Sequence, residues 1–222
     1  MIPKSIIITA GGLGKRMGAT IPKQFLLLAG RPVLIRTIER FLAYDSTIQI
    51  ILVLPSNQFD FWKALCVTHN FHADVEVVKG GKERFHSVQN GLKIARGSLV
   101  GVHDAVRPLV SIDVIERCFS GAEKYDAVIP VMPVIESIRE VGQVDSRALN
   151  RNQFRLVQTP QCFKKEVLMS AYASKFNESF TDDASVVESI GFPICLVEGN
   201  QENIKITSPL DLKMAHVFLE NE

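Results

Sequence analysis

Apolar runs alternate with amphipathic stretches over the first 132 residues of the chain. The runs predict strands at 4–10, 48–54, 75–78, 99–103 and 127–132. Apolar residues at helical spacing predict helices at 32–44, 56–66, 83–95 and 111–122. The first run is rich in isoleucine, which is typical of a strand buried on both faces. Strands and helices in this order predict a mostly parallel sheet covered by helices on both sides.

The pattern breaks between Pro133 and Gln161, where the chain is polar and irregular around Gly142. We expect the excursion at about 134–157 to form a β-arm that projects from the domain. A two-stranded arm is rarely stable alone, so it is expected to pack against a second subunit; a floppy insertion is the alternative. Helices are then expected at 164–176, 182–190 and 208–219, with a strand at 193–197 and a short strand at 204–206.

Composition narrows the class of protein. The 222 residues fit one domain, 1–222, and the formal net charge of +1 offers no broad basic field for nucleic acid. The sequence contains neither a signal-peptide pattern nor an apolar run of transmembrane length. The four cysteines, Cys66, Cys118, Cys162 and Cys195, lack metal-ligand spacing. We therefore expect reduced thiols, a cytoplasmic location, and neither nucleic-acid nor membrane partners.

A glycine-rich loop, Ala10–Gly18, directly follows the first predicted strand. Glycines allow backbone N–H groups to converge on an anion, and Lys15 and Arg16 add positive charge. Lys23 follows soon after in Pro-Lys-Gln-Phe. This combination suits a polyphosphate, with a bare structural turn as the alternative. A Walker A loop would need Ser or Thr after Lys15, and a dinucleotide fingerprint would need glycine in place of Met17.

Six motifs occur in order over nearly the whole chain. They are Ala-Gly-Gly-x-Gly-x-Arg-Met with Pro-Lys-Gln, Gly-Gly-x-Glu-Arg-x-x-Ser-Val from Gly80, His-Asp-Ala-Val-Arg-Pro from His103, Gln-Thr-Pro-Gln from Gln158, Thr-Asp-Asp-Ala-Ser from Thr181, and Val-Glu-Gly-x-x-x-Asn-Ile-Lys-Ile-Thr from Val197. Together they resemble the 2-C-methyl-D-erythritol 4-phosphate cytidylyltransferase family, within the sugar nucleotidyltransferase superfamily. The resemblance implies an α/β, Rossmann-like three-layer sandwich with a mostly parallel twisted sheet and a β-arm for dimerisation.

The resemblance also implies a reaction and a set of site residues. CTP and methylerythritol phosphate would give the CDP-alcohol and pyrophosphate in a magnesium-dependent homodimer. The implied catalytic residues are Arg16, Lys23, Arg151 and Lys205. The implied CTP-binding residues are Ala10, Gly11, Gly12, Leu13, Gly14, Lys15, Arg16, Lys23, Gly80, Gly81, Ser87, Asp104 and Ala105. The implied residues for the alcohol phosphate are Asp104, Arg107, Ser137, Arg151, Thr159, Thr181 and Lys205. Arg151 and Thr159 are expected to reach into the neighbouring subunit's site.

Asp104 is the candidate magnesium ligand, because a carboxylate at the end of a strand can bind the ion while triphosphate oxygens complete its shell. An aspartate that caps the next loop is the alternative.

We expect His103 to be a packed or hydrogen-bonded strand residue and Arg84 to support its loop. Asp182 and Asp183 are explained by the start of a helix. The family often has an acidic residue where Lys82 stands, which leaves base recognition to backbone groups.

Two other functions remain open on the sequence. A cytidylyltransferase for another polyol phosphate, such as ribitol 5-phosphate, would share the fold and closely related motifs. A non-catalytic nucleotide-binding regulatory subunit would share the glycine loop, although it would not need Arg16, Lys23, Asp104 and Lys205 together. A nicotinamide dehydrogenase is disfavoured, because Met17 stands where the dinucleotide fingerprint needs a glycine.

Overall fold

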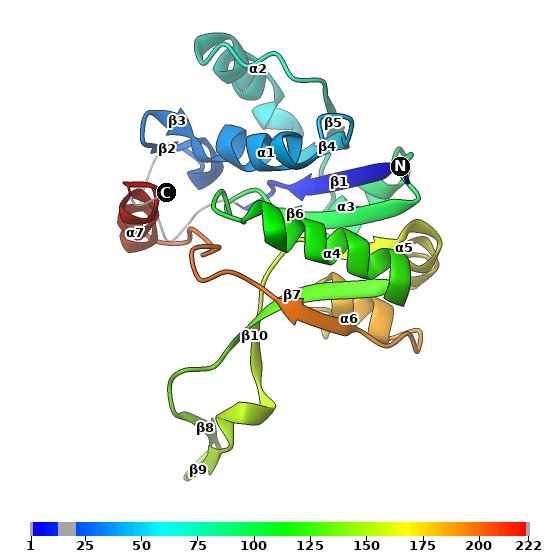
Figure 1. Cartoon of the computed structure of the whole chain (residues 1–222), viewed down its shortest axis with the longest axis vertical. Coiled ribbons are helices and arrows are strands. Elements are labelled where there is room, and N and C mark those ends of the chain that lie inside the picture. Colours follow the sequence, from blue (N-terminus) through cyan, green and yellow to red (C-terminus); the bar gives the residue numbers. More distant parts are fainter. Residues whose placement is uncertain (1, 13–20, 221–222) are drawn as a thin grey trace.

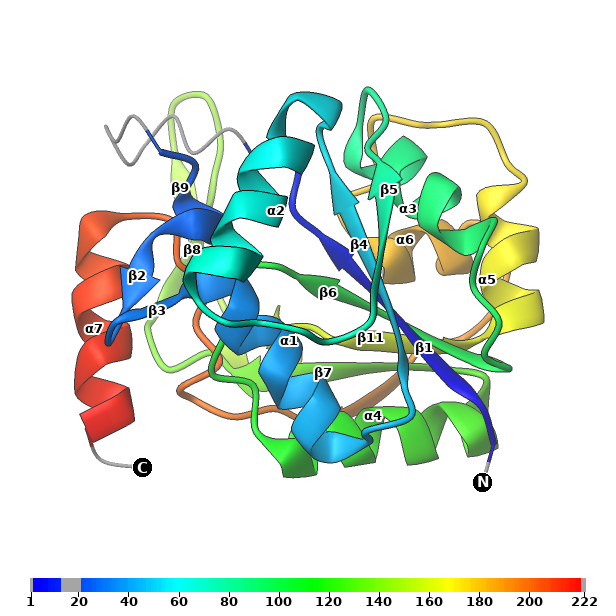
Figure 2. The ribbon, with the colours of Figure 1, turned by 90° about the horizontal axis from the view of Figure 1, so that it is seen from above.

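The fold is seen in a computed structural model that describes residues 2–12 and 21–220. Its main sheet follows the order β10-β7-β11-β6-β1-β4-β5, with β12 paired to β7 (Figures 1 and 2). Its strands are β1 (Lys4–Thr9), β4 (Gln49–Leu54), β5 (Val75–Lys79), β6 (Leu99–Asp104), β7 (Ala127–Pro133), β10 (Arg155–Val157), β11 (Gln161–Lys164) and β12 (Cys195–Glu198). Two small ribbons pair β2 (Leu27–Leu28) with β3 (Arg31–Pro32) and β8 (Ile138–Val141) with β9 (Ser146–Leu149).

Helices cover both faces of this sheet. They are α1 (Val33–Tyr44), α2 (Phe59–Thr68), α3 (Arg84–Leu92), α4 (Ile112–Tyr125), α5 (Lys165–Tyr172), α6 (Asp183–Glu188) and α7 (Pro209–Glu220), with short 3-10 turns η2 (Lys23–Phe25), η3 (Ser56–Gln58) and η4 (Arg151–Gln153). One apolar core joins α1, α2 and α4 to the sheet, and a second joins α3, α5 and α6 to its other face. The expected three-layer α/β sandwich is therefore confirmed.

Strand β1 lies at the centre of the sheet, between β6 and β4, and pairs with both in parallel. Its three isoleucines, Ile6, Ile7 and Ile8, have no exposed surface, because side chains pointing to either face meet a helix layer. The apolar run at 4–10 predicted this strand and its double-sided burial.

The main departures from the sequence prediction lie in the second half of the chain. Strand β11 was missed: it runs antiparallel between β6 and β7, at the end of the segment that was predicted to be irregular. The short strand expected at 204–206 is wrong, because these residues form no ladder. They are instead fastened to the domain by the Ile206 N–H, which donates to the Val106 carbonyl at 2.9 Å.

The segment between β7 and β10 leaves the body of the molecule, and Figure 1 shows β8 and β9 as an arm. These two strands pair only with each other among the described residues. Strand β10 then returns to the main sheet and pairs antiparallel with β7. The arm exposes the apolar side chains Ile135, Val141 and Val144. Its packing against a second subunit stays a prediction.

Candidate active site

The site begins where β1 and β6 end. The two strands are in parallel register, with Thr9 opposite Asp104, so the loops that follow them leave the sheet side by side. The Ala105 N–H donates to the Thr9 carbonyl at 3.1 Å and extends this pairing into the second loop. The carboxyl edge of the sheet therefore brings the glycine loop and the Asp104 motif together, as expected for ligand sites in open α/β sheets.

Two hollows lie at this edge. The first, which we call the glycine hollow, has a volume of about 360 Å³ and is lined by Thr9, Ala10, Gly11, Gly12, Lys23, Gln24, Gly81, Arg84, Ser87, Asp104, Ala105, Val106 and Lys205. The second, the threonine hollow, has a volume of about 290 Å³ and is lined by Arg84, Asp104, Arg107, Val157, Gln158, Thr159, Gln161, Thr181, Asp182 and Lys205. Arg84, Asp104 and Lys205 line both hollows, so the two share a boundary.

Lys23 is held against the glycine loop by the residue that follows it. The buried Gln24 amide donates to the Ala10 carbonyl at 3.0 Å and to Gln58 Oε1 at 2.9 Å. This contact ties the 3-10 turn that carries Lys23 to the start of the loop. A Cβ built on Gly12 would lie 3.6 Å from Lys23 Cε, so the lysine stem runs close to the loop backbone. Gln24 was missed as a site residue, although it belongs to the Pro-Lys-Gln motif.

Asp104 carries the negative charge of the boundary. Its Oδ2 accepts a hydrogen bond from Arg107 Nε at 3.1 Å and forms an ion pair with Lys205 Nζ at 3.1 Å. Burial alone would favour the protonated acid, but Lys205, Arg84 and Arg107 hold the pKa of Asp104 well below its usual range. The carboxylate is therefore ionised at neutral pH and compensates the cations around it.

Asp104 can hold a divalent ion through its other oxygen. Oδ1 makes no hydrogen bond to residues 2–12 or 21–220, whereas Oδ2 is fully engaged. The described part of the chain contains no cluster of three or more His, Cys, Asp or Glu side chains arranged as metal ligands. One carboxylate is a donor set that fits magnesium, which is commonly bound through one or two carboxylates and substrate phosphates.

Thr159 and His103 form a buried hydrogen-bond chain behind Asp104. The Asp104 N–H donates to Thr159 Oγ1 at 3.2 Å, and the Thr159 hydroxyl donates to His103 Nδ1 at 2.9 Å, because the neutral ring carries its hydrogen on Nε2. His103 Nε2–H then donates to the Arg107 carbonyl at 3.0 Å. Burial lowers the pKa of His103 to about 4, so the ring is neutral. The prediction that His103 is a hydrogen-bonded strand residue is confirmed.

Thr159 corrects one expectation. It was expected to reach into a neighbouring subunit, but it is buried in the threonine hollow of its own chain. Strand β11 explains the difference, because its pairing with β6 draws the residues just before it alongside the end of that strand.

The Gly80-Gly81 turn closes the glycine hollow on the side of α3. Gly81 has no room for a side chain, since a Cβ there would lie 2.3 Å from His86 Cβ. Its N–H donates to Ser87 Oγ at 3.1 Å, and the same hydroxyl donates to the Glu83 carbonyl at 3.2 Å. The hydroxyl hydrogen of Ser87 is therefore already donated to Glu83, and its oxygen keeps one lone pair that could accept from a ligand. Gly80 lies in the turn without lining the hollow.

The two aspartates after Thr181, Asp182 and Asp183, have different roles. Asp182 is the N-cap of α6 and accepts from the Ser185 N–H at 2.9 Å, as its place at a helix start predicted. Asp183 is fully buried and instead accepts from Arg84 Nη2 at 2.6 Å. The prediction that Arg84 only supports its loop was incomplete, because Arg84 also lines both hollows.

Four other expected site residues, Leu13, Gly14, Lys15 and Arg16, lie outside the described residues. Ser137 and Arg151 lie on the arm, and neither lines the two hollows. Arg151 is exposed and donates to the Ile135 carbonyl of the arm itself. The expectation that Ser137 and Arg151 line the alcohol-phosphate site is therefore not met within one chain.

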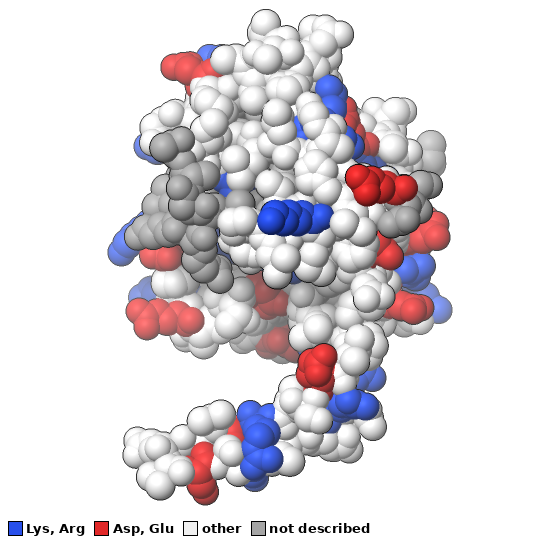
Figure 3. All heavy atoms as spheres, turned by 90° about the vertical axis from the view of Figure 1, so that its left-hand side faces the viewer, with Lys and Arg blue, Asp and Glu red and all other residues white. Residues whose placement is uncertain are grey.

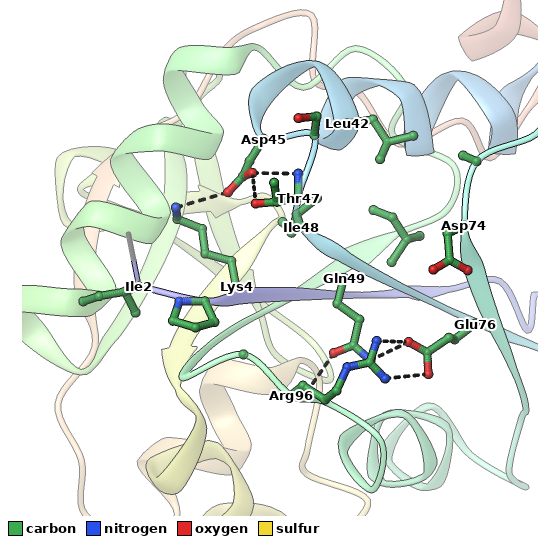
Figure 4. Close-up of a pocket in the computed structure, with 15 residues that line it drawn as sticks. Ile2, Lys4, Leu42, Asp45, Thr47, Ile48, Gln49, Asp74, Glu76 and Arg96 are labelled. Carbon is green, nitrogen blue, oxygen red and sulfur yellow. Dashed lines mark hydrogen bonds and ion pairs between the residues drawn. The ribbon is translucent and has the colours of Figure 1, made fainter.

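A larger cavity, about 520 Å³, lies at the opposite edge of the sheet, beside the start of β1 (Figure 4). Its polar groups bind one another: Arg96 pairs with Glu76, and Gln49 joins both through Glu76 and the Arg96 N–H. Such a network offers a ligand little, and we place the active site at the two smaller hollows. Figure 3, which faces the side of the molecule where α7 lies, shows both signs of charge scattered over the surface.

The comparisons with known proteins point to one family. Residues 5–221 match the model of the IspD family, described as 2-C-methyl-D-erythritol 4-phosphate cytidylyltransferase. Proteins of that name from Bacteroides thetaiotaomicron and Porphyromonas gingivalis are 53% and 48% identical to this chain, over 97% and 96% of it and 99% and 96% of their own lengths. A crystal structure of 2-C-methyl-D-erythritol 4-phosphate cytidylyltransferase from Thermus thermophilus is 31% identical, with a TM-score of 0.79 over 99% of this chain and 100% of that chain. A 4-diphosphocytidyl-2C-methyl-D-erythritol synthase from Anaerococcus prevotii is 28% identical, with a TM-score of 0.83 over 99% of both chains.

No helix in the described part of the chain is both long and apolar enough to cross a membrane.

The buried chain behind Asp104 yields a stability prediction. Thr159→Val should leave the Asp104 N–H without an acceptor and His103 Nδ1 without a donor, at a cost of about 1–3 kcal/mol in the free energy of unfolding. Denaturant unfolding measures the change. Thr68→Val is the matched control, since the Thr68 hydroxyl is exposed and donates to the Ala64 carbonyl of its own helix. Equal stability of the Thr159 variant and the parent would contradict the proposed hydrogen-bond chain.

Proposed function

The chain belongs to the IspD family of 2-C-methyl-D-erythritol 4-phosphate cytidylyltransferases, and we propose that it forms 4-diphosphocytidyl-2-C-methyl-D-erythritol and pyrophosphate from CTP and 2-C-methyl-D-erythritol 4-phosphate. One observation carries this proposal for the chain itself. A glycine-lined hollow and a threonine-lined hollow meet at Asp104 and Lys205, so two phosphate-bearing substrates can touch at one boundary. CTP would occupy the glycine hollow and the alcohol phosphate the threonine hollow.

The reaction needs a phosphate of the alcohol to attack the α-phosphorus of CTP. An oxygen of that phosphate forms the new P–O bond, and the bond from the α-phosphorus to the bridging oxygen of pyrophosphate breaks. The attacking oxygen is already ionised at neutral pH, so no general base is required. The chain must instead hold two polyanions together and neutralise the charge that builds up on the oxygens of the α-phosphate.

Lys23 lines the glycine hollow, and Lys205 lies at the boundary that this hollow shares with the threonine hollow. Lys23 comes from the turn that Gln24 fastens to the glycine loop, and Lys205 comes from the segment before α7. We propose that Lys23 stabilises the transition state on the nucleotide side and that Lys205 binds the phosphate of the alcohol. Arg107 lines only the threonine hollow and serves the alcohol phosphate. Arg16 is assigned the partner role to Lys23 by family resemblance.

We propose magnesium as the metal and Asp104 as its protein ligand. The ionised carboxylate has one engaged oxygen and one that makes no hydrogen bond to the described residues, which suits an ion held mainly by the triphosphate. Bound magnesium would supply neutralisation of the triphosphate charge and orientation of its oxygens.

We also propose a homodimer formed through the arm. The arm exposes Ile135, Val141 and Val144, which a second copy would cover. Arg151 lies on this arm and outside both hollows of its own chain. If Arg151 is catalytic, as the resemblance implies, it must come from the partner. A cytoplasmic location is proposed with it, in keeping with four free cysteines.

The proposed activity is tested by a pyrophosphate-release assay with CTP, magnesium and each of two alcohols. We expect turnover with 2-C-methyl-D-erythritol 4-phosphate and little with ribitol 5-phosphate. The reverse preference would reassign the substrate. Binding of CTP with magnesium but no release of pyrophosphate with either alcohol would favour a regulatory nucleotide-binding protein.

Lys23→Ala should lower kcat on the order of 100-fold, with a smaller change in KM for CTP, because its ammonium acts mainly on transition-state charge. Steady-state kinetics measure both constants. Lys63→Ala is the control, since Lys63 is an exposed lysine on α2 that pairs with Asp60. A Lys23 variant with the parent's kcat would remove this residue from the mechanism.

A mixing experiment tests whether the arm completes the partner's site. Arg151→Ala and Lys23→Ala should each be nearly inactive alone. Unfolding and refolding them together should restore activity, because a mixed dimer contains one site with Lys23 from one chain and Arg151 from the other. Recovery toward about a quarter of parent activity is expected for random pairing. No recovery, with mixed dimers demonstrated, would place Arg151 in its own chain's site or outside catalysis.

A further inference from the structure

Three residues line both hollows, and two of them already have roles. Asp104 and Lys205 bind each other and are assigned to the metal and the alcohol phosphate. The third is Arg84, the first residue of α3. Its position differs from that of Lys205, because it enters the boundary from the layer formed by α3, α5 and α6.

The guanidinium of Arg84 is firmly anchored. Its Nη2 donates to Asp183 Oδ2 at 2.6 Å, and the Tyr172 hydroxyl donates to Asp183 Oδ1 at 2.6 Å. Asp183 has no exposed surface, and the Tyr172 ring stacks on Phe85 with centroids 4.7 Å apart. The capping box between Glu83 and His86 fixes the start of α3 as well. Both the backbone and the charged end of Arg84 are therefore held in place before any substrate arrives.

Most hydrogen-bond donors of Arg84 remain available. A guanidinium has five N–H groups, and among residues 2–12 and 21–220 only Asp183 accepts from this one. A third of the side chain is exposed. The guanidinium is thus a rigid, planar group that has N–H donors to spare and lies at the edge of both hollows. Arginine binds phosphate oxygens in this way, through two parallel N–H groups of a fixed guanidinium.

We propose that Arg84 is a further substrate-contacting residue, whose guanidinium binds phosphate oxygens where the α-phosphate of the nucleotide meets the phosphate of the alcohol. Asp183 and Tyr172 are its positioning residues. The inference rests on the proposed function, because it takes the occupants of the two hollows from it. As the new P–O bond forms and the bond to pyrophosphate breaks, Arg84 would share the charge on the two phosphates that become joined.

If Arg84 had a purely structural role, a different result would be expected. A salt bridge that only fastens α3 to α6 would affect folding, but it would not distinguish ligands with one phosphate from ligands with two. The product carries two phosphates joined across the boundary, whereas CMP carries only the phosphate of the nucleotide side. Binding of these two ligands therefore separates the roles.

The experiment compares Arg84→Met with Arg96→Met in the full-length protein. Arg96 is also paired with a carboxylate, Glu76, but lies at the opposite edge of the sheet. We expect Arg84→Met to lower kcat on the order of 100-fold and Arg96→Met to leave it unchanged. Calorimetry should show product binding weakened at least about tenfold in Arg84→Met and CMP binding weakened by a clearly smaller factor, because CMP offers Arg84 only one of the two phosphates. Arg84→Lys should have a kcat between those of Arg84→Met and the parent, because lysine keeps the positive charge but lacks the planar set of N–H donors of the guanidinium.

Asp183→Asn tests the positioning residues and should lower kcat about tenfold without changing KM for CTP, since the guanidinium remains but loses its charged anchor. Melting curves of each variant show that it is folded at the assay temperature. An Arg84→Met protein that is folded and has the parent's kcat and product affinity would overturn the inference. Equal weakening of CMP and product binding would overturn it too. A parent that neither turns over CTP nor binds the product would instead contradict the proposed function, and the inference would fall with it.

Discussion

The cationic edge of this sheet depends on one carboxylate. Lys205, Arg107 and Arg84 converge where β6 ends, and each would repel the others in the absence of substrate. Asp104 pairs with Lys205 and Arg107, and its field also acts on Arg84, which pairs with Asp183. Two carboxylates therefore offset most of the charge of the three cations, and the remaining positive charge can attract a polyanion. The buried chain from the Asp104 N–H through Thr159 and His103 to the Arg107 carbonyl fixes the backbone that carries this charge.

The parts of this arrangement that sequence could predict are those set by local pattern. The isoleucine run of β1 and the apolar run of β6 predicted two buried strands, and the glycine loop and Asp104 follow them directly. Parallel pairing of those strands then places both loops at one edge. Arg84 was harder to judge, because its motif shows only that it follows a glycine turn, while its anchor, Asp183, lies 99 residues further along the chain.

The missed parts depend on pairings with no local signal. Strand β11 is four residues long and begins with Gln161, so nothing in its pattern predicts an antiparallel strand between β6 and β7. Once it is inserted there, Thr159 must lie beside Asp104, and its expected place in a neighbouring subunit is lost. Lys205 reached the site without the predicted strand, because one backbone hydrogen bond to Val106 and the buried Ile206 side chain are enough to hold the segment.

The two carboxylates near the boundary, Asp183 and Asp104, differ in burial and in the partners that bind them. Asp183 is fully buried and both of its oxygens are engaged, by Arg84 and by Tyr172, so it can neither bind a metal nor release its arginine without leaving a buried charge unpaired. Asp104 retains one oxygen without a hydrogen-bond donor among the described residues, and the side chain of its partner Lys205 is 45% exposed. Entering phosphates can therefore draw Lys205 toward themselves, which would leave Asp104 available for the magnesium ion that we propose. Arg84 has no such freedom, and a cation that cannot move is best suited to the point where the two phosphates must meet.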